Sequence, residues 1–151
     1  FSGHEAIIGA GTVVSCKQVE QVHLAGGEIV ISPNLNPDVI SRTLSSNMIS
    51  VPGVQTVTEA IYATDLGASA LKFFPGAIIT PQSYAAMKVV LPSQQKSIVV
   101  GAVNEHNIAE YLSAGVNAVG LGNYLYKKGY KSENVKDSFM KIKPLIGLRS
   151  K

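Results

Sequence analysis

Six short, apolar and β-branched runs alternate along the chain with amphipathic stretches, and this alternation constrains the fold more than any other feature. The runs are Ala6–Val13, Glu28–Ser32, Met48–Val51, Ala70–Phe74, Ser97–Val103 and Asn117–Leu121. Most of them are apolar on both faces, which is typical of parallel strands that helices cover on each side. The alternation therefore predicts an α/β fold with a parallel sheet, either an open doubly wound sheet or a (β/α)8 barrel.

Each predicted strand is followed by a residue suited to start a helix. These cap residues are Ser15, Asn36, Thr56, Thr80, Asn104 and Ser132. Proline follows two of them, and Thr56 and Glu59 have the spacing of a capping box. Glycines stand where three of the helices should stop, at Gly26, Gly67 and Gly115. We therefore predict six helices, of which the fifth is opened by Asn104-Glu105 and ends near Ser113.

The length limits how much of a barrel this chain can form. A complete (β/α)8 barrel needs about 200 residues or more, whereas the sequence has 151 residues. We expect residues 1–151 to form a single domain with about six of the eight βα units. An open dinucleotide-binding sheet is weakly supported, because Gly9–Val13 matches the glycine fingerprint only in part.

Composition argues against several classes of partner. Eight of the 13 basic residues follow Tyr126, so the basic charge belongs to one terminal helix and tail rather than to a nucleic-acid surface. No apolar run approaches the roughly 20 residues that cross a bilayer, so we predict no membrane partner. The only cysteine, Cys16, excludes an internal disulfide and suits a cytoplasmic location. No two histidines have metal-ligand spacing.

Lys72 is the candidate catalytic residue because it lies inside an otherwise apolar strand. Strand alternation places Lys72 on one face with Ala70 and Phe74, and Leu71 and Phe73 on the other. If the second face packs against helices, the lysine points into the barrel. Burial would lower its pKa, and a neutral amine can attack a ketone to form an imine. The residues alone leave an alternative open, a strand-end lysine that reaches solvent or an ion pair.

Two glycine-containing turns near the C-terminus form a candidate phosphate site. Gly101 and Ala102 end one predicted strand, and Gly122 and Asn123 end the next. In barrels, the loops after the seventh and eighth strands often bind phosphate through backbone amides. The alternative is that these glycines only make tight turns. Three further strand ends, at Thr12, at Ser32-Pro33-Asn34 and at Val51-Pro52-Gly53, should lie at the same edge of the sheet.

The successive strand motifs resemble those of the KDPG/KHG aldolase family. The motifs are Gly9–Val13, Ile31–Asn34, Val51–Val54 and Leu71–Pro75, and the resemblance runs from about Ala6 to about Ile146. It implies a (β/α)8 barrel, a homotrimer and a class I aldolase that needs no cofactor and no metal. Such an enzyme cleaves a 6-phosphorylated 2-keto-3-deoxy sugar acid to pyruvate and glyceraldehyde 3-phosphate. Gly120–Tyr126 is most similar to the phosphogalactonate branch, with the phosphogluconate epimer as the alternative.

The resemblance also implies roles for particular residues. Lys72 would form the imine, Thr12 and Pro33 would line the pyruvate pocket, and Phe74 would pack over that pocket. The phosphate would bind at Gly101, Ala102, Gly122 and Asn123. Two of these depart from the family pattern, because the family has glycine at Ala102 and serine at Asn123.

The family's general-base glutamate has no counterpart in this sequence. It stands on the second family strand, and Glu5, Glu20, Glu28 and Glu59 do not match that position. We therefore expect the chain to be the C-terminal three-quarters of an aldolase barrel, strands 3 to 8, and to be slow or inactive alone. Two other functions stay open: a non-catalytic phosphosugar-binding barrel module, and another phosphate-binding barrel enzyme, such as an epimerase, that does not depend on Lys72.

Overall fold

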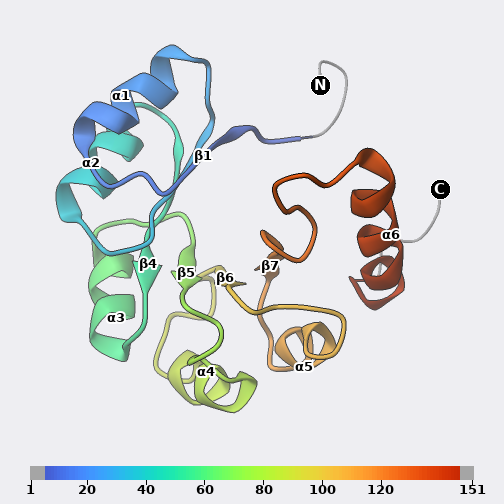
Figure 1. Cartoon of the computed structure of the whole chain (residues 1–151). Helices are drawn as coiled ribbons and strands as arrows, with labels where there is room; N and C mark the ends of the chain where they lie inside the picture. Colours follow the sequence, from blue (N-terminus) through green and yellow to red (C-terminus); the bar gives the residue numbers. More distant parts are fainter. Residues whose placement is uncertain (1–5, 147–151) are drawn as a thin grey trace. The chain divides into compact units, whose positions relative to one another are not determined.

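The computed structural model describes residues 6–146, in which strands and helices alternate (Figure 1). The strands are β1 (Gly9–Gly11), β2 (Ile29–Ile31), β3 (Ile49–Val51), β4 (Gly53–Val54), β5 (Leu71–Phe73), β6 (Ser97–Val100) and β7 (Ala118–Gly120). The helices are α1 (Cys16–Leu24), α2 (Pro37–Ser45), α3 (Val57–Asp65), α4 (Pro81–Lys88), α5 (Ile108–Ser113) and α6 (Ser132–Ile142), and a 3-10 turn, η1 (Lys143–Ile146), follows α6. All six predicted strands are confirmed, in shorter form; β4 was not predicted.

The described residues divide into two compact units. Unit 1 comprises residues 6–72 and 91–96, and unit 2 comprises residues 73–90 and 97–146. The boundary falls inside β5, between Lys72 and Phe73. None of the helices within residues 6–146 is long and apolar enough to cross a membrane. The single domain over residues 1–151 stays a prediction.

Unit 1 contains the parallel sheet β1-β2-β3. Gly9 pairs with Ile29, and Ile29 pairs with Ile49, so the three strands run in register. Helices α1 and α2 pack beside each other in this unit (Figure 1). Their apolar faces close over the sheet in one hydrophobic cluster of Val13, Val19, Val30, Val39 and Met48. This packing holds the carboxyl ends of β1, β2 and β3 at one edge.

Unit 2 contains the parallel pair β6-β7, in which Ile98 lies opposite Ala118 and Val100 lies opposite Gly120. Its core includes Phe73 and Tyr84, whose rings meet edge to face with their centroids 5.1 Å apart. An aromatic pair in this geometry contributes roughly 0.5–1.5 kcal/mol beyond its buried area. The Tyr84 hydroxyl also forms a hydrogen bond with the side chain of Ser97, which begins β6.

Four of the predicted helix caps are confirmed by hydrogen bonds. The Ser15, Asn36 and Thr80 side chains each accept from a backbone amide in the first turn of α1, α2 and α4. Thr56 and Glu59 form the predicted capping box of α3, because each side chain accepts from the backbone amide of the other. Such a cap stabilises a helix by about 1 kcal/mol, and each one fixes where the chain turns after a strand.

The predicted start of the fifth helix is wrong. Asn104-Glu105 does not open α5, which begins at Ile108. The Asn104 amide donates to the side chain of Asn107 at 2.9 Å, and the Asn104 side chain accepts from the amide of His106 at 2.9 Å. These side-chain bonds stabilise a turn that competes with the helix. His106 therefore lies in this turn, not in a first helical turn.

Candidate active site

Lys72 is a buried lysine in the middle of β5. It is 7% exposed, and its neighbours Leu71 and Phe73 are fully buried. The Lys72 amide donates to the Pro52 carbonyl at 2.8 Å, and the Leu71 amide donates to the Lys96 carbonyl at 2.9 Å. Backbone hydrogen bonds to Pro52 and to Lys96, both in unit 1, therefore fix the first two residues of β5. Burial lowers the pKa of the Lys72 amine below its usual value, because the charged form loses hydration.

Two other predicted site residues of unit 1 stand at the ends of neighbouring strands. Thr12 directly follows β1, and Pro33 lies two residues after β2, its partner in the sheet. The Gly53 amide, at the start of β4, donates to the Asn34 carbonyl at 3.2 Å. A Cβ at Gly53 would stand 2.3 Å from the Pro33 carbonyl oxygen, so β4 packs directly on this turn. Thr12 and Pro33 thus follow the carboxyl ends of β1 and β2, in the same unit as Lys72.

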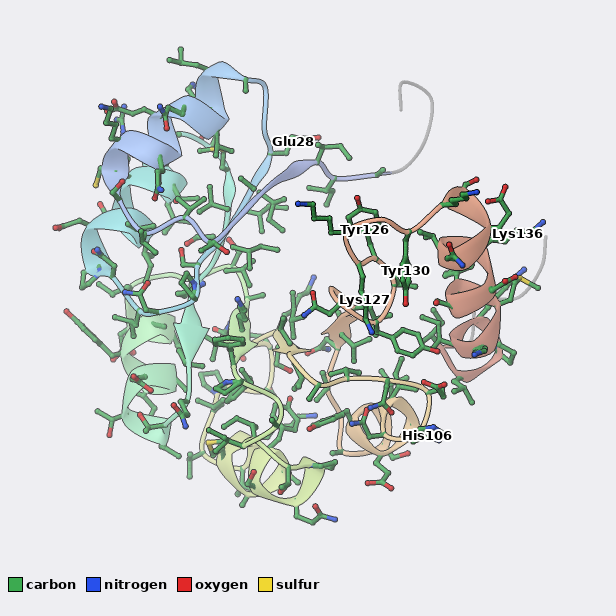
Figure 2. The ribbon with its side chains drawn as sticks, viewed as in Figure 1. Glu28, His106, Tyr126, Lys127, Tyr130 and Lys136 are labelled. Atoms are coloured by element: carbon green, nitrogen blue, oxygen red, sulfur yellow. The ribbon has the colours of Figure 1, made fainter. Side chains whose placement is uncertain are left out.

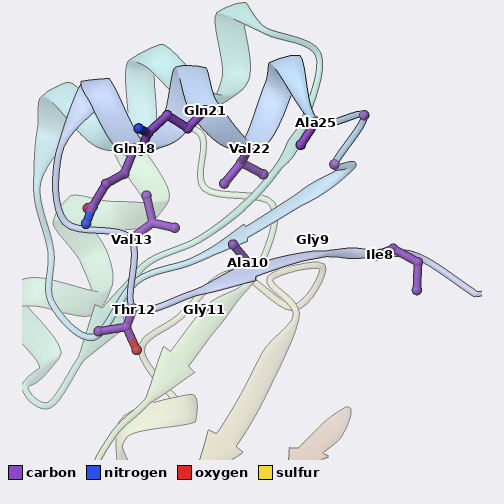
Figure 3. A pocket seen from close by; sticks show the side chains of 12 residues that line it. Ile8, Gly9, Ala10, Gly11, Thr12, Val13, Gln18, Gln21, Val22 and Ala25 are labelled. Carbon is purple, nitrogen blue, oxygen red and sulfur yellow. The ribbon is translucent and has the colours of Figure 1, made fainter.

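Thr12 has an unusual backbone conformation for a β-branched residue. Its φ is 60°, in the left-handed region that disfavours such side chains. Its side chain points away from α1, whereas that of Val13 points toward the helix (Figure 3). In the described part of the chain, the non-glycine residues with positive φ are Thr12, Asn47 and Ala102. Two of these three are predicted site residues, as expected if backbone strain gathers at functional positions.

A cavity of about 430 Å³ in unit 2 is lined by all four predicted phosphate residues. Its lining comprises Val100, Gly101, Ala102, Val103, Asn104, Gly120, Gly122, Asn123, Tyr124 and Lys127. Gly101 and Ala102 both have positive φ, of 93° and 58°. The Phe74 ring lies against this turn, because a Cβ built on Gly101 would be 3.5 Å from Phe74 Cε2. The cavity thus joins the ends of β6 and β7.

Lys127 is the cavity residue that sequence reasoning missed. It carries the only formal charge in the lining and lies in the segment between β7 and α6 (Figure 2). The sequence signal is a lysine four residues beyond Asn123, and it is also the first residue of the basic C-terminal stretch. An ammonium group beside backbone amides favours an anionic ligand.

A second cavity, of about 400 Å³, lies between β1 and α1 in unit 1 (Figure 3). Its lining is mostly apolar or glycine, and its polar side chains are Thr12, Gln18 and Gln21. The Gln18 side chain accepts from the Val14 amide at 2.7 Å, so it already has a structural partner. No titratable side chain lines this cavity, and it is not a candidate catalytic centre.

The described carboxylates considered from the sequence are engaged elsewhere or lie away from the carboxyl ends of the strands. Glu20 pairs with Arg42 at 3.2 Å, and Glu59 accepts the amides of the α3 cap. Glu28 precedes β2, at the amino end of the strand (Figure 2). Glu5 lies outside the described residues. Within residues 6–146 there is no group of three or more His, Cys, Asp or Glu side chains that could hold a metal ion.

The comparisons with known proteins assign the chain to a family. The family model described as KDPG and KHG aldolase matches residues 2–142. The chain belongs to this aldolase family. Its similarity to the 2-dehydro-3-deoxy-6-phosphogalactonate aldolase of Escherichia coli (strain K12) is 40% identity over 131 residues. That alignment covers 87% of this chain and 64% of the relative, so the chain spans less than two thirds of the relative's length.

Solved structures of the aldolase family confirm the predicted fold class. A structure described as native KDPGal has a TM-score of 0.89 and 36% identity, covering 95% of this chain and 72% of that one. The KDPG aldolase of Legionella pneumophila, solved with pyruvate captured as a covalent carbinolamine, has a TM-score of 0.77 and 29% identity. It covers 97% of this chain and 70% of that one. The chain is therefore α/β, with the strand and helix order of the family barrel.

Proposed function

We propose that the protein is a class I aldolase in which the Lys72 amine forms a Schiff base with a phosphorylated 2-keto-3-deoxy sugar acid. The observation that carries the proposal is the position of this lysine, buried in a strand with its pKa lowered by loss of hydration. A covalent pyruvate adduct in the Legionella relative supports the same chemistry.

The proposed reaction begins when the neutral amine attacks the ketone carbon, C2, of the substrate. The resulting carbinolamine loses water and gives a protonated imine, which withdraws electrons from the adjacent C3. Transfer of the C4 hydroxyl proton to a water molecule then breaks the C3–C4 bond and releases an aldehyde. The electron pair stays on the pyruvate enamine, which takes a proton back from water at C3. Hydrolysis of the new imine releases pyruvate and restores Lys72.

The remaining residues are proposed to hold the two ends of the substrate. In unit 1, Thr12 and Pro33 would line the pyruvate pocket. Phe74 would pack over the pyruvate end, as the family resemblance implies, and the 430 Å³ cavity of unit 2 would bind the phosphate. The relative from Escherichia coli supports 2-dehydro-3-deoxy-6-phosphogalactonate as the substrate, and the phosphogluconate epimer is the alternative. The products are pyruvate and glyceraldehyde 3-phosphate.

Borohydride trapping tests this proposal directly. The full-length protein as encoded is incubated with pyruvate and sodium borohydride, and the modified peptide is identified by mass spectrometry. We expect a reduced adduct on Lys72, its loss in Lys72→Met and its retention in Lys17→Met, a change at an exposed lysine of α1. No adduct, or an adduct on another lysine, contradicts the proposal. Activity on a phosphosugar that survives Lys72→Met favours an epimerase, and saturable phosphosugar binding without pyruvate release favours a binding module.

The proposal also includes an oligomeric state and a cellular location. We propose a homotrimer, as the family resemblance implies, and a cytoplasmic location, which the single cysteine suits. Sedimentation equilibrium at several protein concentrations tests the first, and a mass corresponding to one chain contradicts it.

A further inference from the structure

The hydroxyl group of Tyr111 holds a loop that packs against Val100 and Gly101, two lining residues of the cavity in unit 2. Tyr111 lies in α5 and is 3% exposed. Its hydroxyl oxygen is 2.8 Å from the Gly76 carbonyl oxygen and 2.9 Å from that of Ile79. Both carbonyls belong to the loop that joins β5 to α4. Burial raises the pKa of Tyr111, so the hydroxyl keeps the proton that it shares between the two carbonyls.

This loop packs against the turn that begins the phosphate cavity. The Gly76 amide donates to the Val100 carbonyl at 2.8 Å. Gly76 is buried, and a Cβ added to it would stand 2.3 Å from the Gly101 carbonyl oxygen. The same turn contacts the Phe74 ring. Because no space separates Gly76 from Gly101, a movement of the loop must displace the first residue of the phosphate turn.

We propose that Tyr111 is a positioning residue for phosphate binding. Its hydroxyl fixes Gly76, and Gly76 in turn sets the position of the Gly101 and Ala102 amides that face the anion. This role rests on the proposed function, in which the cavity of unit 2 binds the substrate phosphate. It differs from a purely structural role, because both acceptors of the hydroxyl lie in the β5–α4 loop and neither lies in the helix that carries Tyr111.

Tyr84 offers a matched control within the same unit. It is 1% exposed, and its hydroxyl forms a hydrogen bond with the Ser97 side chain and another with the Gly115 carbonyl. Ser97 begins β6, whereas Val100, which Gly76 contacts, ends it. The Tyr84 hydroxyl therefore bonds to the first residue of β6, whereas the Tyr111 hydroxyl acts, through Gly76, on the last residue of β6, where the cavity lies.

The experiment compares Tyr111→Phe with Tyr84→Phe in the full-length protein. Three quantities are measured: the dissociation constant for inorganic phosphate, KM and kcat for pyruvate release, and the rate of borohydride trapping with pyruvate. We expect Tyr111→Phe to raise the phosphate dissociation constant and KM about fivefold to tenfold, the effect of losing one well-placed hydrogen bond. Pyruvate carries no phosphate, so its trapping rate should not change. Tyr84→Phe should lower the melting temperature and leave phosphate binding unchanged.

The inference is overturned if folded Tyr111→Phe binds phosphate as the parent does, or if both variants weaken it equally. It is also overturned if the parent has no measurable phosphate affinity. A parent that binds phosphate but traps no pyruvate refutes the aldolase proposal instead, because phosphate binding is read independently of catalysis. Should Tyr111→Phe fail to fold, Gly76→Ala displaces the same loop from its other side and must weaken phosphate binding.

Discussion

Replacing Gly76 with alanine tests the tight contact between the β5–α4 loop and the Gly101-Ala102 turn of the proposed phosphate site. The added Cβ would meet three groups: the Gly101 carbonyl oxygen at 2.3 Å, Val99 Cγ1 at 3.0 Å and the Val100 carbonyl oxygen at 3.3 Å. The nearest of these is a backbone atom, which cannot rotate away as the end of a flexible side chain can. The backbone itself must therefore move.

The size of this movement sets the expected effect. Contacts of a real Cβ below 3.0 Å are essentially never seen, so the distance of 2.3 Å must grow by at least about 0.7 Å. Overpacking a buried site in this way costs about 1–3 kcal/mol of unfolding free energy. A displacement of about 1 Å at a substrate-positioning group can lower the rate about 100-fold. We expect the smaller shift at Gly101 to lower kcat/KM by at least about tenfold.

The assay follows pyruvate release from the phosphorylated substrate and, separately, phosphate affinity and melting temperature. Gly11→Ala is the control, because no heavy atom lies within 4 Å of a Cβ built at Gly11. It should keep the activity, with unfolding free energy unchanged or raised by up to about 1 kcal/mol. If Gly76→Ala folds and keeps both kcat/KM and phosphate affinity within about twofold of the parent, the close contact has no role in binding.

Three further predictions concern single groups of the proposed site. At pH 7.5 a lysine with the usual pKa of 10.5 is neutral in only about one molecule in a thousand. Because burial lowers the pKa of Lys72, its trapping rate with pyruvate should rise with pH and reach its midpoint below pH 10.5. A midpoint at or above that value would contradict the reasoning. Ala102→Gly removes a side chain from a residue with φ of 58° and should raise the unfolding free energy by about 0.5–1 kcal/mol, measured by urea titration; no gain means that the turn holds alanine without strain. Lys127→Gln should weaken phosphate binding about tenfold, and the difference from the parent should shrink as salt is added. Lys128→Gln, which lies outside the cavity lining, should leave phosphate binding unchanged. Equal effects of the two substitutions would indicate general surface charge instead of a specific contact.

The elements that the sequence predicts correctly are those decided by local chemistry. Ser15, Asn36 and Thr80 stand before helices because a short polar side chain accepts a free first-turn amide, and the structure shows each of these bonds. The same reasoning was wrong at Asn104, where a second asparagine three residues later offers a competing turn. A cap residue alone does not distinguish a helix start from a side-chain-stabilised turn.

The candidate site was predictable only in part. Alternation indicated that Lys72 could be buried, and the structure confirms the burial. Neither the positive φ of Thr12 nor the hydrogen bonds of Tyr111 has a local sequence signal, because both result from tertiary packing. Tyr111 contacts carbonyls 35 and 32 residues earlier in the chain. Contacts at this separation follow from the fold and not from a motif.

The left-handed conformations of Thr12 and Ala102 bear on how the protein would respond to artificial selection. Glycine is the residue that this conformation favours. A screen for thermal resistance would therefore select glycine at Thr12 and Ala102, which are two positions of the proposed site. Such a screen would alter ligand recognition early, whereas substitutions at the capped helix starts would add little stability. Libraries built on this scaffold should therefore hold both positions constant and look for added robustness elsewhere.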